Sequence, residues 1–139
     1  MQSEHFIGKI TQKALIQKEG RLLIQRHSTG KVFDLPGGRL HKNENPKVGF
    51  IREVKEELGI DIIPGRMVGS TVTSYVDGTP CYCVFYEVLL PDPLPEFTLD
   101  PVEVAEIRWA NEIELNVLLE PFWLNIALEY LSTSTQNSS

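Results

Sequence analysis

The stretch from Asn45 to Gly59 constrains the fold most, because both ends of a helix can be recognised in it. Asparagine is a favoured N-cap residue, and Pro46 suits the first helical position because its missing N–H would be unpaired there anyway. Gly59 stands where a left-handed C-cap residue belongs. The sequence therefore predicts a helix that begins at Pro46 and ends at Leu58.

Segments rich in β-forming residues lie on both sides of this helix, and helical periodicity returns near the C-terminus. The expected strands are residues 7–16, 21–25, 67–75, 80–90 and 106–110. The turn sequences Lys18-Glu19-Gly20 and Asp77-Gly78 predict that the first two strands form one hairpin and the next two another. Residues 113–131 are expected to be helical, with an interruption at Pro121. This order predicts an α/β or α+β layered domain with a mixed sheet.

Length and composition predict one domain and limit its partners. The chain has 139 residues, of which 42% are hydrophobic, so we expect a single domain over residues 1–131 and a disordered polar tail over residues 132–139. The net charge of -6 and the lack of a basic cluster argue against a nucleic-acid groove. No apolar run is long enough to span a membrane, and no signal-peptide pattern is present, so we expect a cytoplasmic protein. A homodimer remains one possible oligomeric state.

Two cysteines, Cys81 and Cys83, alternate along an expected strand. Their side chains should point to the same face, and a bridge between residues two apart would strain the backbone. A metal site would need further cysteines or nearby histidines, and the histidines are far away in the sequence. We therefore expect two half-buried free thiols.

The predicted helix carries three carboxylates on one face, Glu53, Glu56 and Glu57, because residues three and four apart are helix neighbours. Such a face can be an ordinary solvated surface. However, like charges at this spacing repel, and a divalent cation would remove the repulsion. Gly37 and Gly38 precede the helix and let the backbone approach a ligand closely, although two glycines after a proline can also form a simple turn.

The string from Gly38 to Ile60, GRLHKNENPKVGFIREVKEELGI, matches the Nudix box in every fixed position. The matching positions are Gly38, Glu44, Arg52, Glu53, Val54, Glu56, Glu57, Gly59 and Ile60. So many constrained positions in a short span make a chance match remote. The chain therefore resembles the Nudix hydrolase family, and its small size resembles the MutT-type members.

This resemblance implies a central mixed β-sheet sandwiched between α-helices, with the box forming a loop–helix–loop that holds a catalytic metal. The implied cofactor is Mg²⁺, with Mn²⁺ as a substitute. Glu53 and Glu57 would be the main ligands, Glu56 would ligate directly or through water, and a carbonyl of Gly37 or Gly38 would help.

The resemblance also assigns supporting roles. Arg52 would orient an acidic neighbour through a charge-assisted hydrogen bond, and Glu44 would support the loop. Hydrolysis also needs a group that accepts a proton from water. The candidates are Glu103 and Glu106 in the downstream segment and Glu53 in the box, of which Glu103 is preferred.

The expected activity is hydrolysis of a phosphoanhydride bond in a nucleoside diphosphate linked to a further group. A nucleoside triphosphate pyrophosphohydrolase of MutT type is favoured. The alternatives are an ADP-ribose or nucleotide-sugar pyrophosphatase, a dinucleoside polyphosphate pyrophosphatase, and a nucleotide-binding or nucleotide-sensing module without turnover. The substrate-binding candidates are Arg26, Phe33 and Tyr75, and the alternative for the two aromatic residues is packing in the core.

Overall fold

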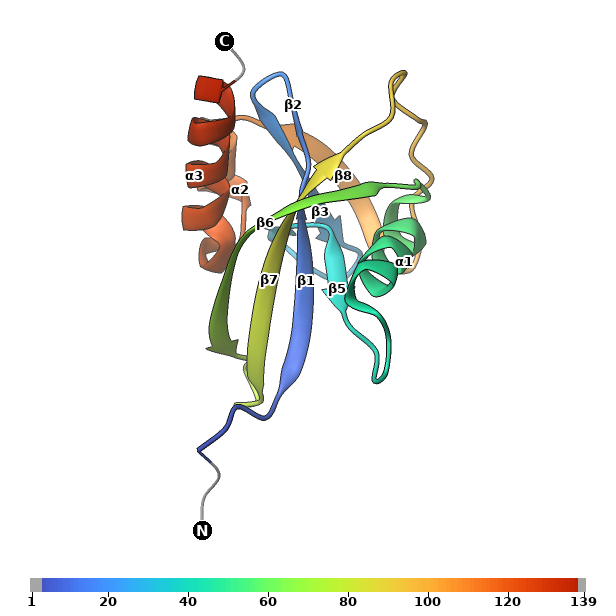
Figure 1. Ribbon diagram of the computed structural model, residues 1–139. Helices are drawn as coiled ribbons and strands as arrows, with labels where there is room; N and C mark the ends of the chain where they lie inside the picture. Colours follow the sequence, from blue (N-terminus) through green and yellow to red (C-terminus); the bar gives the residue numbers. More distant parts are fainter. Residues whose placement is uncertain (1–3, 138–139) are drawn as a thin grey trace.

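The computed structural model describes residues 4–137 (Figure 1). Within this range the strands form two four-stranded sheets. The first contains β5 (Gly37–Arg39), β1 (Lys9–Leu15), β7 (Pro80–Leu89) and β6 (Ile63–Ser74), in that order. The second contains β2 (Gln17–Lys18), β3 (Arg21–His27) and β4 (Phe33–Asp34), with β8 (Val104–Ala110) paired to β3.

The first sheet is mixed, because β1 runs parallel to β7 and antiparallel to β5. Its pairing places Thr11 opposite Arg39 and Lys13 opposite Gly37. Alternate residues of a strand share one face, so Thr11 and Lys13 point to the same side of the sheet. The predicted α+β fold with a mixed sheet is confirmed, while the division into two sheets was not predicted.

Helix α1 (Pro46–Leu58) lies on one side of the sheets, and α2 (Glu112–Leu118) and α3 (Pro121–Asn137) lie on the other (Figure 1). Each side has its own hydrophobic core. The core under α1 includes Phe50, Val54 and Leu58, and the core under the C-terminal helices includes Leu115 and Ala127. All five of these side chains are fully buried, so packing on both sides fixes the sheets between the helices.

The ends of α1 agree with the sequence prediction. The Asn45 side chain accepts hydrogen bonds from the N–H groups of Lys47 and Val48, and Gly59 adopts the left-handed conformation with φ 69°. The segment after β7 is attached to this end of the helix, because the N–H groups of Thr98 and Asp100 donate to the last carbonyls of α1. The loop that leads to β8 is thereby held next to the C-terminus of α1.

The predicted hairpin around Asp77-Gly78 is confirmed as β6 and β7. The first predicted hairpin is wrong for most of its length. Residues 11–16 are buried on both faces, as in a central strand, so β1 pairs with β5 and β7 rather than with β3. Of the segment before the turn, β2 alone pairs with β3 as predicted, through Gln17 opposite Leu22 and Lys18 opposite Arg21.

The end of α3 overlaps the tail predicted from residue 132, whose disorder stays a prediction. Helix α3 continues to Asn137, because Tyr130 and Leu131 are buried and no proline or glycine follows them in the helix. The Thr133 hydroxyl donates to the Glu129 carbonyl within the helix. Residues 138 and 139, the end of the predicted tail, lie outside the described residues.

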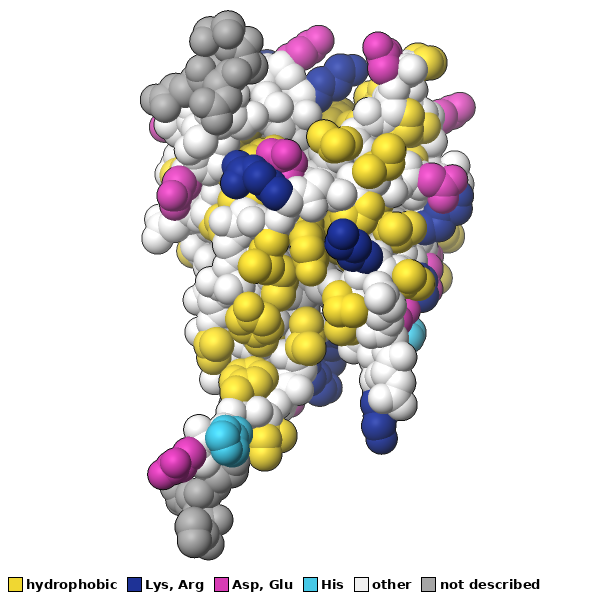
Figure 2. All heavy atoms as spheres, viewed as in Figure 1, with side chains coloured by type: hydrophobic (Ala, Val, Ile, Leu, Met, Phe, Trp, Pro, Cys, Tyr) yellow, Lys and Arg dark blue, Asp and Glu magenta, His cyan; other side chains and the backbone are white. Residues whose placement is uncertain are grey.

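Apolar side chains are also exposed at the surface of the molecule (Figure 2). Ile63, Met67, Val72 and Leu89 on β6 and β7 are each more than half exposed. No helix in the described part of the chain is both long and apolar enough to cross a membrane. The homodimer considered from the sequence stays a prediction.

Candidate active site

Glu57 lies in the last turn of α1 and points into the protein against β5. Its carboxylate accepts hydrogen bonds from the Gly37 N–H at 2.8 Å and from Gln25 Nε2 on β3 at 3.0 Å. Burial raises the pKa of Glu57 to about 7, although these hydrogen bonds and nearby Lys13 act in the opposite direction. Such a carboxylate is costly to ionise unless a cation joins it.

Glu53 lies one turn earlier and contacts the next residue of β5. A Cβ atom added to Gly38 would be only 2.3 Å from Glu53 Oε2, so the absence of a side chain at Gly38 makes room for this carboxylate. Burial also raises the pKa of Glu53, while Arg52 lowers it. Two partly desolvated carboxylates from α1 therefore border the same short strand.

Arg52 connects the remaining acidic residues of the helix and its preceding loop. Its guanidinium donates to Glu44 at 2.7 and 3.0 Å, and it lies 3.1 Å from Glu53 and 3.1 Å from Glu56. The hydrogen bond from Arg52, with a second from the His41 N–H, lowers the pKa of Glu44 to about 2. Arg52 thus makes the charge-assisted contacts with acidic neighbours that the resemblance implied.

The carboxylates of α1 do not converge as closely as helix periodicity suggested. Glu56 turns outward to Arg52 and its side chain is 56% exposed. Among residues 4–137, no group of three or more His, Cys, Asp and Glu side chains is arranged to hold a metal ion. Glu56 is therefore directed to Arg52 in this structure, and its role as a metal ligand stays a prediction.

A smaller set of oxygen atoms still fits a hard cation. Magnesium commonly takes one or two carboxylates and completes its shell with water and substrate phosphates. Glu53, Glu57 and the backbone of Gly38 offer only oxygen donors. Beside them, Gln25 Oε1 is buried and has no hydrogen-bond partner in the described residues. An unsatisfied buried oxygen beside two carboxylates is consistent with an ion or its bound water here.

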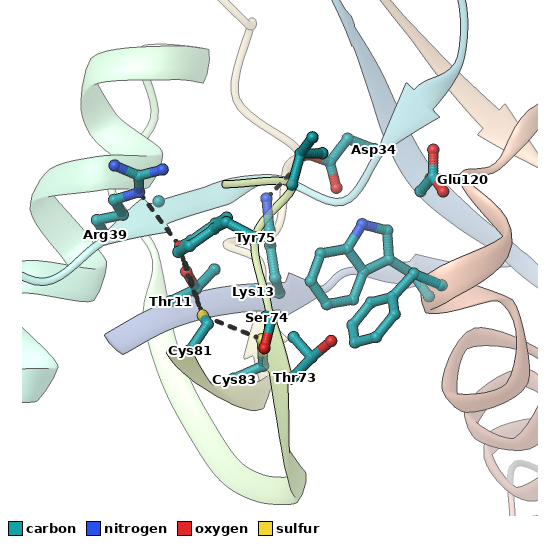
Figure 3. A pocket seen from close by; sticks show the side chains of 14 residues that line it. Thr11, Lys13, Asp34, Arg39, Thr73, Ser74, Tyr75, Cys81, Cys83 and Glu120 are labelled. Atoms are coloured by element: carbon teal, nitrogen blue, oxygen red, sulfur yellow. Dashed lines mark hydrogen bonds and ion pairs between the residues drawn. The ribbon is translucent and has the colours of Figure 1, made fainter. Parts of the chain in front are cut away.

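A cavity of about 480 Å³ adjoins this region on the other side of β5 (Figure 3). Gly38 and Arg39 of β5 form part of its wall, and Lys13 reaches it from β1. Lys13 Nζ donates to Asp34 Oδ2 at 3.1 Å and lies 5.4 Å from the ring centroid of Trp123 on α3. The positively charged Lys13 side chain thus lies between the carboxylates of α1 and the aromatic cavity.

Tyr75, the residue directly after β6, also lines this cavity (Figure 3). The Arg39 guanidinium lies 4.3 Å from the Tyr75 ring centroid, and Arg39 Nε donates to the Tyr75 hydroxyl at 3.2 Å. The structure therefore places one of the three predicted substrate-binding residues in a cavity that touches the box.

The other two predicted substrate-binding residues lie elsewhere. Phe33 is 4% exposed, belongs to the hydrophobic core and does not line the cavity, so its role in substrate binding stays a prediction. Arg26 does not line the cavity, and its guanidinium donates to Glu106 at 3.1 Å and to the Gly30 carbonyl at 3.2 Å. Glu103 carries a half-exposed side chain whose carboxylate lies 3.3 Å from His27 Nε2.

Comparison with known proteins agrees with this arrangement. The family described as "NUDIX domain" matches residues 13–129, which is most of the chain. The chain belongs to the Nudix family. The matched range includes α1, both glycines of β5 and most of the cavity wall.

The relatives of this Nudix domain differ in function. A MutT-like protein of Streptomyces ambofaciens is 38% identical over 55 residues, 40% of this chain and 36% of that protein. An 8-oxo-dGTP diphosphatase of Proteus vulgaris is 33% identical over 48 residues, 34% of this chain and 43% of that protein. The aligned parts thus span less than half of these relatives. The MutT protein of Methanosarcina mazei Go1 has the same fold, with a TM-score of 0.74, 25% identity and coverage of 91% of this chain and 94% of that one.

Some residues of this Nudix site were missed from the sequence. Lys13, Gln25 and Trp123 come from three different elements and meet the box only in the folded chain. The sequence holds one weak indication of the first two. Lys13 and Gln25 are polar residues inside apolar strands, and both are buried in the structure. A buried polar residue on a strand therefore indicates a site, but not which site.

The burial of Glu57 predicts how the stability of the metal-free Nudix domain depends on pH. Because its pKa is raised from 4.5 to about 7, the folded protein binds this proton more tightly than the unfolded chain. This contribution to stability is complete below the unfolded pKa and is lost as the pH rises through the folded pKa. At about 1.4 kcal/mol per pKa unit, its upper limit is about 3 kcal/mol.

We expect the free energy of unfolding of the wild type in EDTA, relative to that of Glu57→Gln, to fall between about pH 4.5 and pH 7. Urea unfolding of both proteins across this range measures the difference and cancels the other titrating groups. A difference that does not change with pH would contradict the burial of this carboxylate.

Proposed function

We propose that this Nudix domain hydrolyses a phosphoanhydride bond of a nucleoside triphosphate and releases a nucleoside monophosphate and pyrophosphate. The observation that supports this most directly is the position of Gly38. This residue contacts the Glu53 carboxylate and also lines the aromatic cavity. A phosphate chain bound at the carboxylates would therefore have its nucleoside next to a cavity of suitable size and character.

In this proposal Glu53, Glu57 and the backbone of Gly38 hold a divalent cation, Mg²⁺ or Mn²⁺. The bound ion would neutralise phosphate charge and polarise the attacked phosphoryl group. Arg52 keeps the neighbouring carboxylates in place through its contacts with Glu44 and Glu53. Lys13 contributes a positive charge on the side where the phosphates meet the cavity.

The cavity has the composition of a nucleoside-binding site. Trp123 lies in contact with Phe122 at a ring-centroid distance of 4.6 Å, and both line the cavity. Their apolar faces suit a base, while Asp34 and Glu120 place carboxylate oxygens in the same wall, where they can accept hydrogen bonds. Tyr75 closes the side nearest Arg39 (Figure 3).

The general base is a further part of the proposal. Hydrogen bonds from Arg26 and Arg108 lower the pKa of Glu106, which makes it a weaker proton acceptor. Glu103 is free of such guanidinium contacts among the described residues and is preferred over Glu106. Glu53 remains the competing base within the box.

There are two alternatives to this proposal: hydrolysis of another substrate class, and nucleotide binding without turnover. Names of relatives do not distinguish a triphosphate from a nucleotide sugar, ADP-ribose or a dinucleoside polyphosphate as the substrate. A binding module without turnover is less well supported, because Glu53, Glu56 and Glu57 are all present in the box. We also expect the protein to act in the cytoplasm.

The test is release of phosphate or pyrophosphate from a panel of nucleoside triphosphates, nucleotide sugars, ADP-ribose and dinucleoside polyphosphates. The assay runs with Mg²⁺, with Mn²⁺ and with EDTA, and added phosphatase reveals monophosphate products. We expect EDTA-sensitive turnover that is fastest with a triphosphate. Turnover that favours another class would replace the substrate, and tight nucleotide binding without turnover on any class would favour the binding module.

A further inference from the structure

Cys81 and Cys83 form a close pair of thiols in the wall of the aromatic cavity (Figure 3). Their Sγ atoms are 3.5 Å apart, and both cysteines are free. Each residue is only 1% exposed overall, so the cavity is the route by which a ligand reaches the sulfur atoms. The activity proposed above uses neither thiol.

The spacing favours one bridging atom over a direct bond between the sulfurs. Residues two apart on a strand have Cα atoms about 6.6 Å apart, and their side chains project in parallel. A disulfide needs Cβ atoms at about 3.5–4.5 Å, which this backbone does not provide without distortion. A separation of 3.5 Å, combined with two bonds of about 2.3 Å to a soft atom, gives an angle of about 100° at that atom.

This angle distinguishes between the soft atoms that could bridge the two sulfurs. A two-coordinate linear ion would need its sulfur ligands about 4.6 Å apart, twice the bond length of about 2.3 Å. A tetrahedral zinc ion would need two further ligands, and the described residues offer no third His, Cys, Asp or Glu that could join the pair. A three-coordinate pyramidal centre that brings its own third substituent meets both conditions.

We propose that Cys81 and Cys83 are a dithiol site for a monosubstituted trivalent arsenical. The reaction of the hydrated arsenical, R–As(OH)₂, breaks two S–H bonds and two As–O bonds and forms two As–S bonds. The thiol protons leave with the two hydroxyl groups as two molecules of water. No atom changes its oxidation state, so the reaction needs no oxidant or reductant.

The surroundings of the two sulfurs suit a stepwise reaction. Cys81 Sγ lies 3.2 Å from the Thr11 hydroxyl and 3.4 Å from the Tyr75 hydroxyl. Burial raises the pKa of Cys81, but hydrogen bonds with these hydroxyls and Cys83 outweigh it and leave the pKa below its usual value. Burial raises the pKa of Cys83 to about 12. Cys81 therefore attacks first, and Cys83 closes the chelate.

The organic substituent would lie in the cavity, which is large enough for an aromatic ring and is also lined by Phe122 and Trp123. The inference does not depend on the enzymatic activity, because it uses only the two thiols and the space beside them. It does predict that an arsenical and a nucleoside would compete for one cavity.

The probe is phenylarsine oxide, and the readout is the intact mass of the folded protein. We expect one adduct per chain that survives an excess of a monothiol and is removed by a small dithiol. Cys81→Ser and Cys83→Ser should each weaken binding by about 100-fold or more, because a single thiol loses the second, intramolecular bond. The chain has only two cysteines, so the double serine variant controls for binding to other groups.

A wild-type adduct that the monothiol removes, or a single serine variant that keeps a monothiol-resistant adduct, would overturn the proposal. If the serine variants do not fold, arsenic X-ray absorption on the wild type decides the question. Two sulfur neighbours per arsenic atom are expected, and a single sulfur neighbour would overturn the assignment.

Discussion

Replacing Glu57 with glutamine is expected to lower turnover by about 10³-fold or more while the fold survives. The glutamine side chain keeps the size of the glutamate and can still accept the Gly37 N–H, which lies 2.8 Å from Oε1 in the wild type. It lacks the negative charge that a divalent cation needs. Initial rates at saturating Mg²⁺ and substrate measure the effect.

The same substitution should not weaken the metal-free fold. Glutamine removes a carboxylate that is costly to bury, and the Gln25 amide can rotate so that its unpartnered Oε1 accepts a hydrogen bond from the new side chain. Glu129→Gln, at an exposed position on α3, is the matched control and should retain full turnover. Near-normal turnover in folded Glu57→Gln and Glu53→Gln would refute the metal assignment.

Replacing Gly37 with alanine is expected to have the largest effect on stability, a loss of about 3 kcal/mol or more. Gly37 has φ +129°, where residues with a side chain are strained, and an added Cβ atom would lie 2.0 Å from the Gln12 carbonyl oxygen. The clash falls on the backbone of β1, which pairs with β5 at this point. The strands must therefore separate, because no side chain can move aside.

Gly20→Ala is the matched control. Gly20 also has a positive φ, +76°, but an added Cβ atom would meet nothing within 4 Å. This variant should lose only about 1 kcal/mol, the cost of the backbone conformation. Urea unfolding of both variants separates the cost of backbone strain at a positive φ from the cost of the collision between the added Cβ atom and β1. Equal losses in the two proteins would show that the close contact between Gly37 and β1 does not matter.

The sequence predicted local structure better than the packing of distant segments. Asn45, Pro46 and Gly59 act through their own backbone geometry, so both ends of α1 could be recognised from residue types. The partners of β1 could not be recognised in this way. Its pairing with β7 joins residues about 70 positions apart, so it depends on long-range packing that residue types near β1 do not reveal.

The candidate site shows the same difference between what local sequence predicts and what packing decides. Periodicity placed Glu53 and Glu57 on one helix face, and the structure brings both to β5. Periodicity also placed Glu56 with them, but it could not foresee that Arg52 would hold this residue outward. Rotamers and ion pairs decide where a carboxylate points, and the spacing of residues along a helix does not contain that information.

The strand β5 has only three residues, yet it forms the boundary between two structurally separate halves of the site. Gly37 and Gly38 contact the carboxylates of α1, while Gly38 and Arg39 face a cavity whose other walls come largely from β6, β7 and α3. If the proposed function holds, substitutions in those walls change which base is accommodated without moving Glu53 or Glu57. Descendants of such a chain could therefore diverge in the molecules they select while they inherit the same bond-breaking chemistry.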